Sequence, residues 1–349
     1  MSGASNDELM IGVVAPGDPD DAPLIRGAGI EWIRLGAPFP FADRVGGELA
    51  EPYLKFRAHA RAWADAGLRI MGVTPGPGVK LRERDGEGNL QLVWHRHLPE
   101  WCGELGSRKC QDAYEAVCAR FAEDLRGVVG AWQIGNELDW HQFAGPLNAR
   151  QACDFILSGA RGLKGADPSL ICGHNLTGNA LSYFFYGRLF GGSDGLLDYC
   201  GIDRYFGSWQ PGGPEDWAPL IQELWDLTGA PVLINEWGFA SAGGVMTAED
   251  RAAGAVACEC GRWPHTWGPG HTPEGQAEFI GRAFDAFAEV RRCLLGQFYF
   301  RWADQETCWQ CGAPGCAAET AWGLVDLQGR PKPSYEALKE GVRRLRAQR

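Results

Sequence analysis

The sequence predicts an α/β fold, a single (β/α)8 TIM barrel over residues 1–349 with elaborated loops at its C-terminal face. Three observations lead to this prediction. Short runs rich in Val, Ile and Leu alternate with segments of helical spacing, which implies parallel strands joined by helical crossovers. The runs number eight, as a barrel requires. The first run leads into VVAPGDPDD, which lacks the GxGxxG loop of a competing doubly wound sheet.

The expected strands are apolar runs bounded by Gly, Pro or polar residues. In chain order they are Met10–Ala15, Trp32–Leu35, Leu68–Val73, Val128–Ile134, Leu170–Gly173, Tyr199–Ile202, Val232–Ile234 and Leu294–Phe300. The expected helices are Tyr53–Ala66, Asp112–Leu125, Arg150–Leu163, Glu215–Leu227, Pro273–Cys293 and Ser334–Leu345. Barrels carry their chemistry at the C-terminal ends of the strands, so the residues that follow each run are the candidates for a functional site.

Composition argues against several classes of function. A formal net charge of -11 and a pI near 5.2 disfavour a nucleic-acid partner, which needs clustered Lys and Arg. No apolar run reaches the roughly 18 residues of a membrane span, and the opening MSGASNDELM lacks the basic and then apolar pattern of an export signal. We therefore expect a cytoplasmic protein without a membrane partner. The sequence does not indicate its oligomeric state.

The dipeptide Asn-Glu occurs twice, in IGNELDW and in LINEWGF, each time directly after an apolar run. On the strand count these places follow strands four and seven, whose ends face each other across the mouth of a closed barrel. Glu137 and Glu236 are therefore candidates for two carboxylates that flank a glycosidic bond. One carboxyl group would protonate the leaving oxygen while the other attacks the anomeric carbon.

At these residues the sequence resembles clan A of the retaining glycoside hydrolases, which are barrels with an acid/base Glu after strand four and a nucleophile Glu after strand seven. The resemblance makes Glu137 the acid/base, Glu236 the nucleophile and Asn136 the group that bonds the sugar 2-hydroxyl. It covers most of the chain, with Arg34 similar to the clan's arginine beside the nucleophile, Tyr205 in GIDRYFG to its strand-six tyrosine and Trp302 in FYFRWAD to its strand-eight tryptophan. It implies a glycosyl-enzyme intermediate. The sequence contains no HExxH motif and no comparable His triad, so we expect no catalytic metal and no cofactor for catalysis.

Other polar and aromatic residues near the expected strand ends are candidate sugar contacts, namely His174, Asp203, Trp237 and Asp304. The apolar C–H faces of a sugar stack on aromatic surfaces, which also gives the fifteen tryptophans of the chain a purpose. Each candidate has a structural alternative. The histidine suits a core position, the aspartates suit pairing with an arginine, and some tryptophans must pack the loops.

Seven of the twelve cysteines lie in expected loops. CECG after strand seven carries Cys258 and Cys260, and CWQCGAPGC after strand eight carries Cys308, Cys311 and Cys316. These two loops are neighbours in a barrel, so four thiolates can close a tetrahedral structural zinc site. Disulfides and free thiols stay open as alternatives. The spacing favours a metal site, but twelve cysteines are many for a chain that looks cytoplasmic, where stable disulfides are rare.

The sequence thus predicts a retaining O-glycosidase that acts on an oligosaccharide, a polysaccharide or a small glycoside. Retention predicts carboxyl groups about 5 to 5.5 Å apart, against roughly 6.5 to 9.5 Å for an inverting site. Two alternatives stand beside it. One is a carbohydrate-binding barrel without catalysis, and the other is a thiol or metal protein centred on the cysteine-rich loops.

Overall fold

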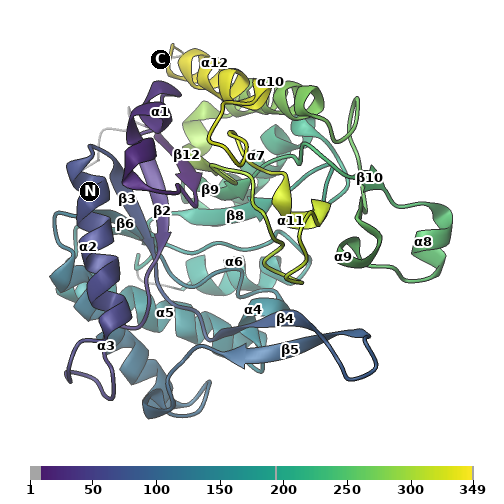
Figure 1. Ribbon diagram of the computed structural model, residues 1–349. Helices are drawn as coiled ribbons and strands as arrows, with labels where there is room; N and C mark the ends of the chain where they lie inside the picture. The colour runs from purple at the N-terminus through teal and green to yellow at the C-terminus, as the bar shows by residue number, and fades with distance from the viewer. Residues whose placement is uncertain (1–8, 193–194, 348–349) are drawn as a thin grey trace. The chain divides into compact units, whose positions relative to one another are not determined.

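The structure is a computed structural model that describes residues 9–192 and 195–347 (Figure 1). Residues 1–8, on which the expectation about an export signal chiefly rests, lie outside this range. The chain forms two compact units. Among the described residues, the first unit comprises residues 9–31, Arg204–Glu223 and residues 234–347, and the second unit comprises residues 32–192, 195–203 and Leu224–Leu233.

Eight parallel strands make up the main sheet, at the places where the apolar runs predict them. They are β1 Met10–Val14, β2 Trp32–Gly36, β3 Arg69–Val73, β6 Val129–Gln133, β7 Ile171–Gly173, β8 Cys200–Arg204, β9 Val232–Trp237 and β12 Leu294–Tyr299. Their order in the sheet is β7-β6-β3-β2-β1-β12-β9-β8. Parallel bridges from Gly173 to Tyr199 and from Leu176 to Ile202 bring the two ends of this order together in a nearly closed barrel. The predicted TIM-barrel fold is confirmed.

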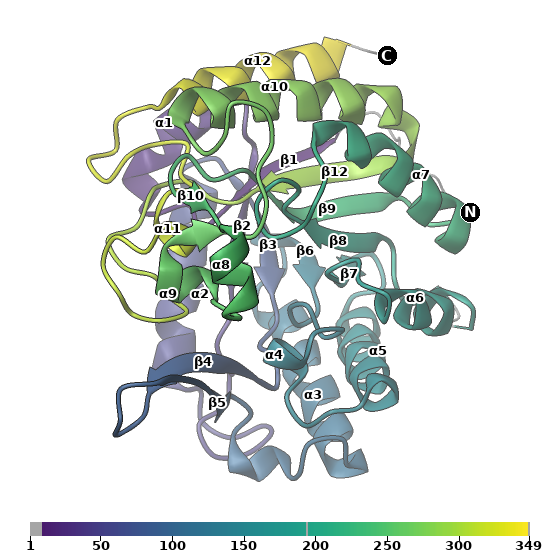
Figure 2. The same ribbon diagram turned by 90° about the vertical axis from the view of Figure 1, so that its right-hand side faces the viewer.

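Helices alternate with the strands. The longer ones are α1 Ala22–Gly27, α2 Glu51–Asp65, α3 Arg108–Asp124, α5 Ala149–Ala166, α6 Ser182–Phe190, α7 Trp217–Thr228, α10 Pro273–Glu289 and α12 Pro333–Ala347. Helix α5 begins with a capping box, in which the Asn148 side chain accepts from the Gln151 N–H and the Gln151 side chain accepts from the Asn148 N–H. In the second unit α3 packs on α5, and in the first unit α10 packs on α12 (Figure 2).

Three excursions lengthen the connections after β3, β9 and β12. Their elements are the antiparallel hairpin β4 Gly78–Arg84 and β5 Leu90–Arg96, the small parallel pair β10 Gly244–Val245 and β11 Arg262–Trp263 with α8 Ala248–Ala252 and α9 Ala257–Cys260 between its strands, and α11 Ala317–Thr320. A further short helix, α4 His141–Ala144, follows β6. Single turns of 3-10 helix lie at Pro19–Asp21, Glu100–Cys102, Pro214–Asp216 and Arg291–Cys293. Elaborated loops therefore follow the strand ends.

The core of each unit lies between its strands and helices and is rich in aromatic rings. In the second unit Trp132 of β6 stacks on Phe121 of α3, with ring centroids 5.1 Å apart. In the first unit Trp237 of β9 packs edge-on against Phe287 of α10 at 4.9 Å. Across residues 9–192 and 195–347, no helix has both the length and the apolar character that crossing a membrane requires.

Candidate active-site residues

A hydrogen-bonded network joins side chains at the ends of β2 and β6 in the second unit. Arg34 of β2 donates from Nε to Gln133 Oε1 and from Nη2 to Asn136 Oδ1, both at 2.8 Å. A planar guanidinium holds two such acceptors in fixed positions, which the single point charge of a lysine does not. Both Arg34 and Gln133 are buried. Arg34 thus fixes Asn136, the residue directly before Glu137.

Asn175, which follows β7, lies at the centre of this network. Its Nδ2 donates to Asn136 Oδ1 at 2.9 Å and to a carboxylate oxygen of Asp203. Its Oδ1 accepts from Gln133 Nε2 at 2.8 Å and from the Glu137 backbone N–H at 3.1 Å. Because several donors converge on Asn136 Oδ1, the amide NH2 of Asn136 is turned away from the network. Asp203 is only 1% exposed and braces Asn175.

Glu137 has a backbone conformation that few residues other than glycine adopt. Its φ is +44°, in the left-handed region, where a Cβ atom costs about 1–2 kcal/mol. Such a conformation persists only where the surroundings impose it, and here the Glu137 N–H is held by Asn175. Glu137 is 8% exposed. Backbone outliers of this kind cluster at functional sites.

In the first unit Tyr205 and Glu236 meet directly. Tyr205, the residue after β8, donates its phenol O–H to Glu236 Oε2 at 2.5 Å. The exposed fraction is 8% for Tyr205 and 9% for Glu236. Glu236 lies inside β9, which runs three residues beyond the expected strand. The phenol fixes the orientation of the carboxylate through one of its two oxygens.

Arg301 and Glu319 interact electrostatically with Glu236. Neither was among the candidates that the sequence offered. Glu319 of α11 is 3% exposed and accepts a 2.5 Å hydrogen bond from Gln310 Nε2. Burial raises the pKa of Glu319 to about 8, and electrostatic repulsion from Cys308 and, to a smaller extent, from Glu236 adds to the rise. Burial lowers the pKa of Arg301, although the negative charge of Glu319 acts to raise it. A Glu in the stretch AETAW carries no sequence signal of burial, because only the folding of the loop creates it.

His174 and Trp237 lie in the core. His174 is fully buried beside the rings of Tyr186 and Phe190, and neither ring nitrogen has a hydrogen-bond partner in the described part of the chain. Burial lowers the pKa of His174 to about 3, so the ring is neutral. Trp237 is also fully buried, and its Nε1 donates to Gln297. The histidine therefore occupies the core position that the sequence left open, and the tryptophan is a packing residue.

Trp302 and Asp304 follow β12 and support the loop there. Trp302 is 1% exposed, and its ring packs edge-on against Tyr335 at 6.3 Å. Asp304 Oδ1 accepts from Lys332 Nζ at 3.0 Å and from the Gly323 N–H at 2.7 Å. Asp304 therefore braces the loop through a lysine rather than through an arginine.

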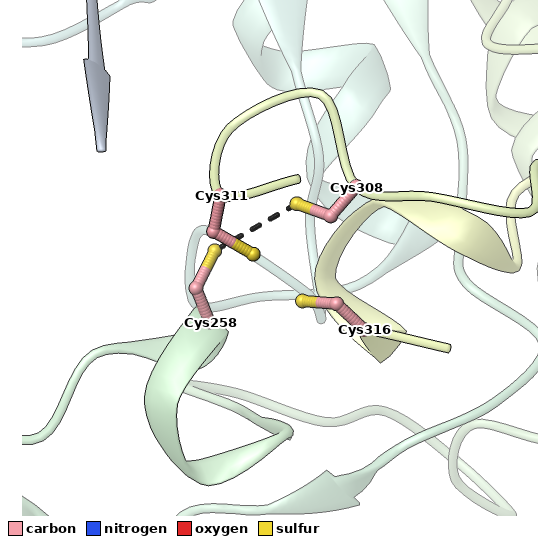
Figure 3. A group of neighbouring side chains, drawn as sticks. All are labelled: Cys258, Cys308, Cys311 and Cys316. Carbon is pink, nitrogen blue, oxygen red and sulfur yellow. Dashed lines mark hydrogen bonds between the residues drawn. The ribbon is translucent and has the colours of Figure 1, made fainter. Parts of the chain in front are cut away.

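Four of the five cysteines predicted as metal ligands converge in the first unit (Figure 3). The sulfur atoms of Cys258, Cys308, Cys311 and Cys316 lie within 4.8 Å of one another. Cys260 lies outside the group, with its Sγ donating to the Arg262 carbonyl at 3.7 Å. Residues two apart on a helix point to different sides, so α9 presents only one of its two thiols to the group. All twelve cysteines fall within the described residues, and none forms a disulfide.

No protein-family model and no curated protein matches the sequence. Solved structures resemble the fold. A GH5_18 protein from Streptomyces cattleya, in complex with GlcNAc, has a TM-score of 0.68 and 16% identity over 98% of this chain and 81% of that chain. A family 39 glycoside hydrolase from Bacteroides cellulosilyticus WH2 has a TM-score of 0.62 and 16% identity over 97% of this chain and 64% of that chain.

The exo-β-1,4-mannosidase Op5Man5 from Opitutaceae bacterium strain TAV5 has a TM-score of 0.62 and 16% identity, over 99% of this chain and 62% of that chain. The chain thus spans less than two thirds of the length of the family 39 enzyme and of the mannosidase. These structural neighbours are glycoside hydrolases, and at such low identity the likeness concerns the fold.

Proposed function

We propose that the protein is a retaining glycoside hydrolase, with Glu236 as nucleophile and Glu137 as acid/base. The observation that carries the proposal is the 2.5 Å hydrogen bond from Tyr205 to Glu236 near the C-terminal end of β9. Barrel enzymes hold their reacting groups at such strand ends, and a buried carboxylate with a fixed orientation suits a nucleophile. The glycoside hydrolases among the structural neighbours support the same function.

In the proposed reaction Glu236 attacks the anomeric carbon, the bond to the leaving oxygen breaks, and Glu137 protonates that oxygen. Water then attacks the anomeric carbon of the glycosyl-enzyme, Glu137 takes a proton from the water, and Glu236 is released. Two displacements at one carbon retain its configuration. Asn136 donates to the sugar 2-hydroxyl from the NH2 group that Arg34 and Asn175 orient through its Oδ1.

Hydrolysis of a panel of aryl glycosides tests this function. The panel contains glucosides, mannosides and N-acetylglucosaminides, the sugars that the names of the structural neighbours suggest. We expect Glu236→Gln to abolish turnover. With the wild type, we expect NMR of the first product to show the same anomeric configuration as the substrate. Glu274→Gln, which changes an exposed carboxylate in α10, is the matched control and is expected to keep the wild-type rate.

Azide separates the roles of the two carboxylates. With Glu137→Ala and an activated aryl glycoside, azide is expected to speed release of the glycosyl-enzyme and to give a glycosyl azide of retained configuration. With Glu236→Ala, it is expected to give the inverted azide. An inverted product from the wild type, or near-normal turnover by Glu236→Gln, would contradict the proposal. Sugar binding without turnover by the wild type would favour the carbohydrate-binding barrel instead.

A further inference from the structure

Four thiols from two separate segments of the chain converge in the first unit (Figure 3). Cys258 belongs to α9, whereas Cys308, Cys311 and Cys316 belong to the segment after β12, with Cys316 as the N-terminal cap of α11. The four sulfur atoms gather around one point. A cysteine that serves only as a small core residue has no need of three other thiols beside it, so this convergence indicates another role.

The spacing of the sulfur atoms fits a tetrahedral metal ion. Cys258 Sγ lies 3.8 Å from Cys308 Sγ. Zinc–sulfur bonds of about 2.3 Å in a tetrahedron place neighbouring sulfurs about 3.8 Å apart. A disulfide needs sulfurs about 2.05 Å apart and joins only two of them. The structure brings four sulfurs together with no disulfide among them.

The backbone of residues 308–312 forms a tight turn that places Cys308 and Cys311 close together. Gly312 closes the turn, because its N–H bonds the Cys308 carbonyl at 2.7 Å and its φ of +69° costs a glycine little.

We propose that Cys258, Cys308, Cys311 and Cys316 bind one structural zinc ion. Four thiolates close a tetrahedral coordination sphere and leave no open position for a substrate, which is typical of structural zinc. The Cys-x2-Cys spacing of Cys308 and Cys311 lies within the range of such sites. Binding releases the protons of the four thiols. This site is independent of the roles proposed for Glu137 and Glu236.

The zinc ion links the excursion after β9 to the excursion after β12. Both segments contribute to one buried cluster that contains Trp263, Trp322 and Tyr205. The rings of Tyr205 and Trp322 lie 5.0 Å apart. The ion therefore holds together the two segments whose buried cluster packs against Tyr205. Because the unfolded chain has no preformed site, the free energy of metal binding also stabilises the folded protein.

The metal content of the full-length wild type is the first test. The protein is purified without a metal-affinity column, dialysed and analysed by mass spectrometry of its elements, and we expect about one zinc per chain. Protein made in medium with cobalt in place of zinc is expected to show the visible absorption of a tetrahedral cobalt thiolate. Neither measurement depends on a variant that folds.

Variants then identify the ligands. Cys311→Ser and Cys316→Ser are expected to lose most of the zinc and to unfold at a lower temperature. Cys260→Ser is the matched control, because Cys260 is a thiol of the same helix as Cys258 and lies outside the group. It is expected to keep the zinc content and the thermal midpoint of the wild type.

Three results would overturn the assignment. The first is wild-type protein without zinc whose cysteines titrate as twelve free thiols or as disulfides. The second is zinc replaced by iron in protein from ordinary medium. The third is zinc loss in Cys260→Ser as large as in Cys311→Ser.

Discussion

Because Glu137 has a left-handed backbone conformation, a substitution there is expected to affect catalysis and stability in different ways. Its φ of +44° is a conformation that asparagine tolerates better than glutamate does. Glu137→Asn is therefore expected to lower kcat by about 10²–10⁴, the usual contribution of an acid/base group. The same variant is expected to keep its free energy of unfolding or to gain about 1 kcal/mol. Aryl glycoside kinetics and urea unfolding measure the two effects.

Asp139, two residues further along, provides the control. Its carboxylate accepts hydrogen bonds from Thr177 and Ser182 and is buried. Asp139→Asn turns one acceptor oxygen into a donor and is expected to lower the free energy of unfolding by about 1–3 kcal/mol. If Glu137→Asn is destabilised as strongly as Asp139→Asn, the conformation of Glu137 stores no strain.

His174 makes stability depend on pH. Its folded pKa of about 3 lies below the ordinary value of 6.5, so between these pH values the unfolded chain binds a proton on His174 that the folded protein does not bind. This contribution to stability is present above pH 6.5 and is lost as the pH falls toward 3. Between pH 7 and pH 5 the wild type is expected to lose about 2 kcal/mol more unfolding free energy than His174→Leu.

Urea titrations of both proteins at the two pH values measure the difference. His141→Gln changes an exposed histidine of α4 and is expected to behave as the wild type does. Equal pH dependence of the wild type and His174→Leu would show that His174 is not the group that responds.

Among single residues, the sequence predicts those whose type and position after a strand indicate their chemistry. Tyr205 and Glu236 were predicted from strand ends, and the structure joins them by a hydrogen bond. Gln133 and Glu319 were not predicted, since a glutamine in a strand and a glutamate in a loop resemble many others. Their roles come from burial, which depends on distant segments. The separation of the Glu137 and Glu236 carboxyl groups stays a prediction.

Among the elements, α3 and α5 approach each other so closely that one position must be glycine. A Cβ atom on Gly162 of α5 would overlap the carbonyl group of Glu115 in α3. Gly162→Ala is therefore expected to push the helices apart and to lower the free energy of unfolding by about 1–3 kcal/mol. Gly165 lies on the same helix and faces open space.

Gly165→Ala is thus the matched control, and its better helix propensity is expected to raise the free energy of unfolding by up to about 1 kcal/mol. Chemical denaturation of the three proteins gives both values. A loss of stability in Gly162→Ala no larger than the change in Gly165→Ala would mean that the helix pair can adjust.

The elements that sequence patterns predict are those with one continuous apolar face or core. All eight barrel strands are of this kind, and their observed ends differ from the expected ones by at most three residues. The hairpin β4–β5 was missed because KLRER and QLVWHR mix apolar and charged residues on a mostly half-exposed ribbon. Helix α9 is a single turn, too short to show a period.

The first unit draws on both ends of the chain, so its stability depends on the last helix. Leu338 and Val342 of α12 are buried, and Gly341 lies against Phe284 of α10. A chain that stops after Gly329 is expected to expose the apolar side of α10, to bind an apolar dye and to lose its cooperative unfolding transition. Near-wild-type unfolding of this chain would show that α12 is dispensable.

A two-glycine insertion between Glu87 and Gly88 is the control for this truncation. It lies in the exposed turn of the hairpin β4–β5, where added residues meet little packing. The insertion is expected to leave the unfolding transition unchanged.

At the scale of the whole molecule, the count and order of the strands were enough to predict the barrel. They were not enough to predict which loop residues would meet. Cys258 and Cys308 are neighbours through the fold of two irregular excursions, whereas Cys260, which the sequence groups with them, lies apart. Apolar periodicity specifies the scaffold, whereas the loops depend on individual contacts.

The pairing of β1 with β12 has a consequence during synthesis. The register from Met10 with Gly296 to Val13 with Tyr299 joins residues from nearly opposite ends of the chain. A ribosome that adds about 5 to 20 residues per second makes the partner of β1 roughly 15 to 60 seconds after β1 itself. Through that interval the apolar segment MIGVV has an unpaired edge, the kind of surface that chaperones bind. The rate of translation therefore sets how long the nascent chain needs protection from aggregation.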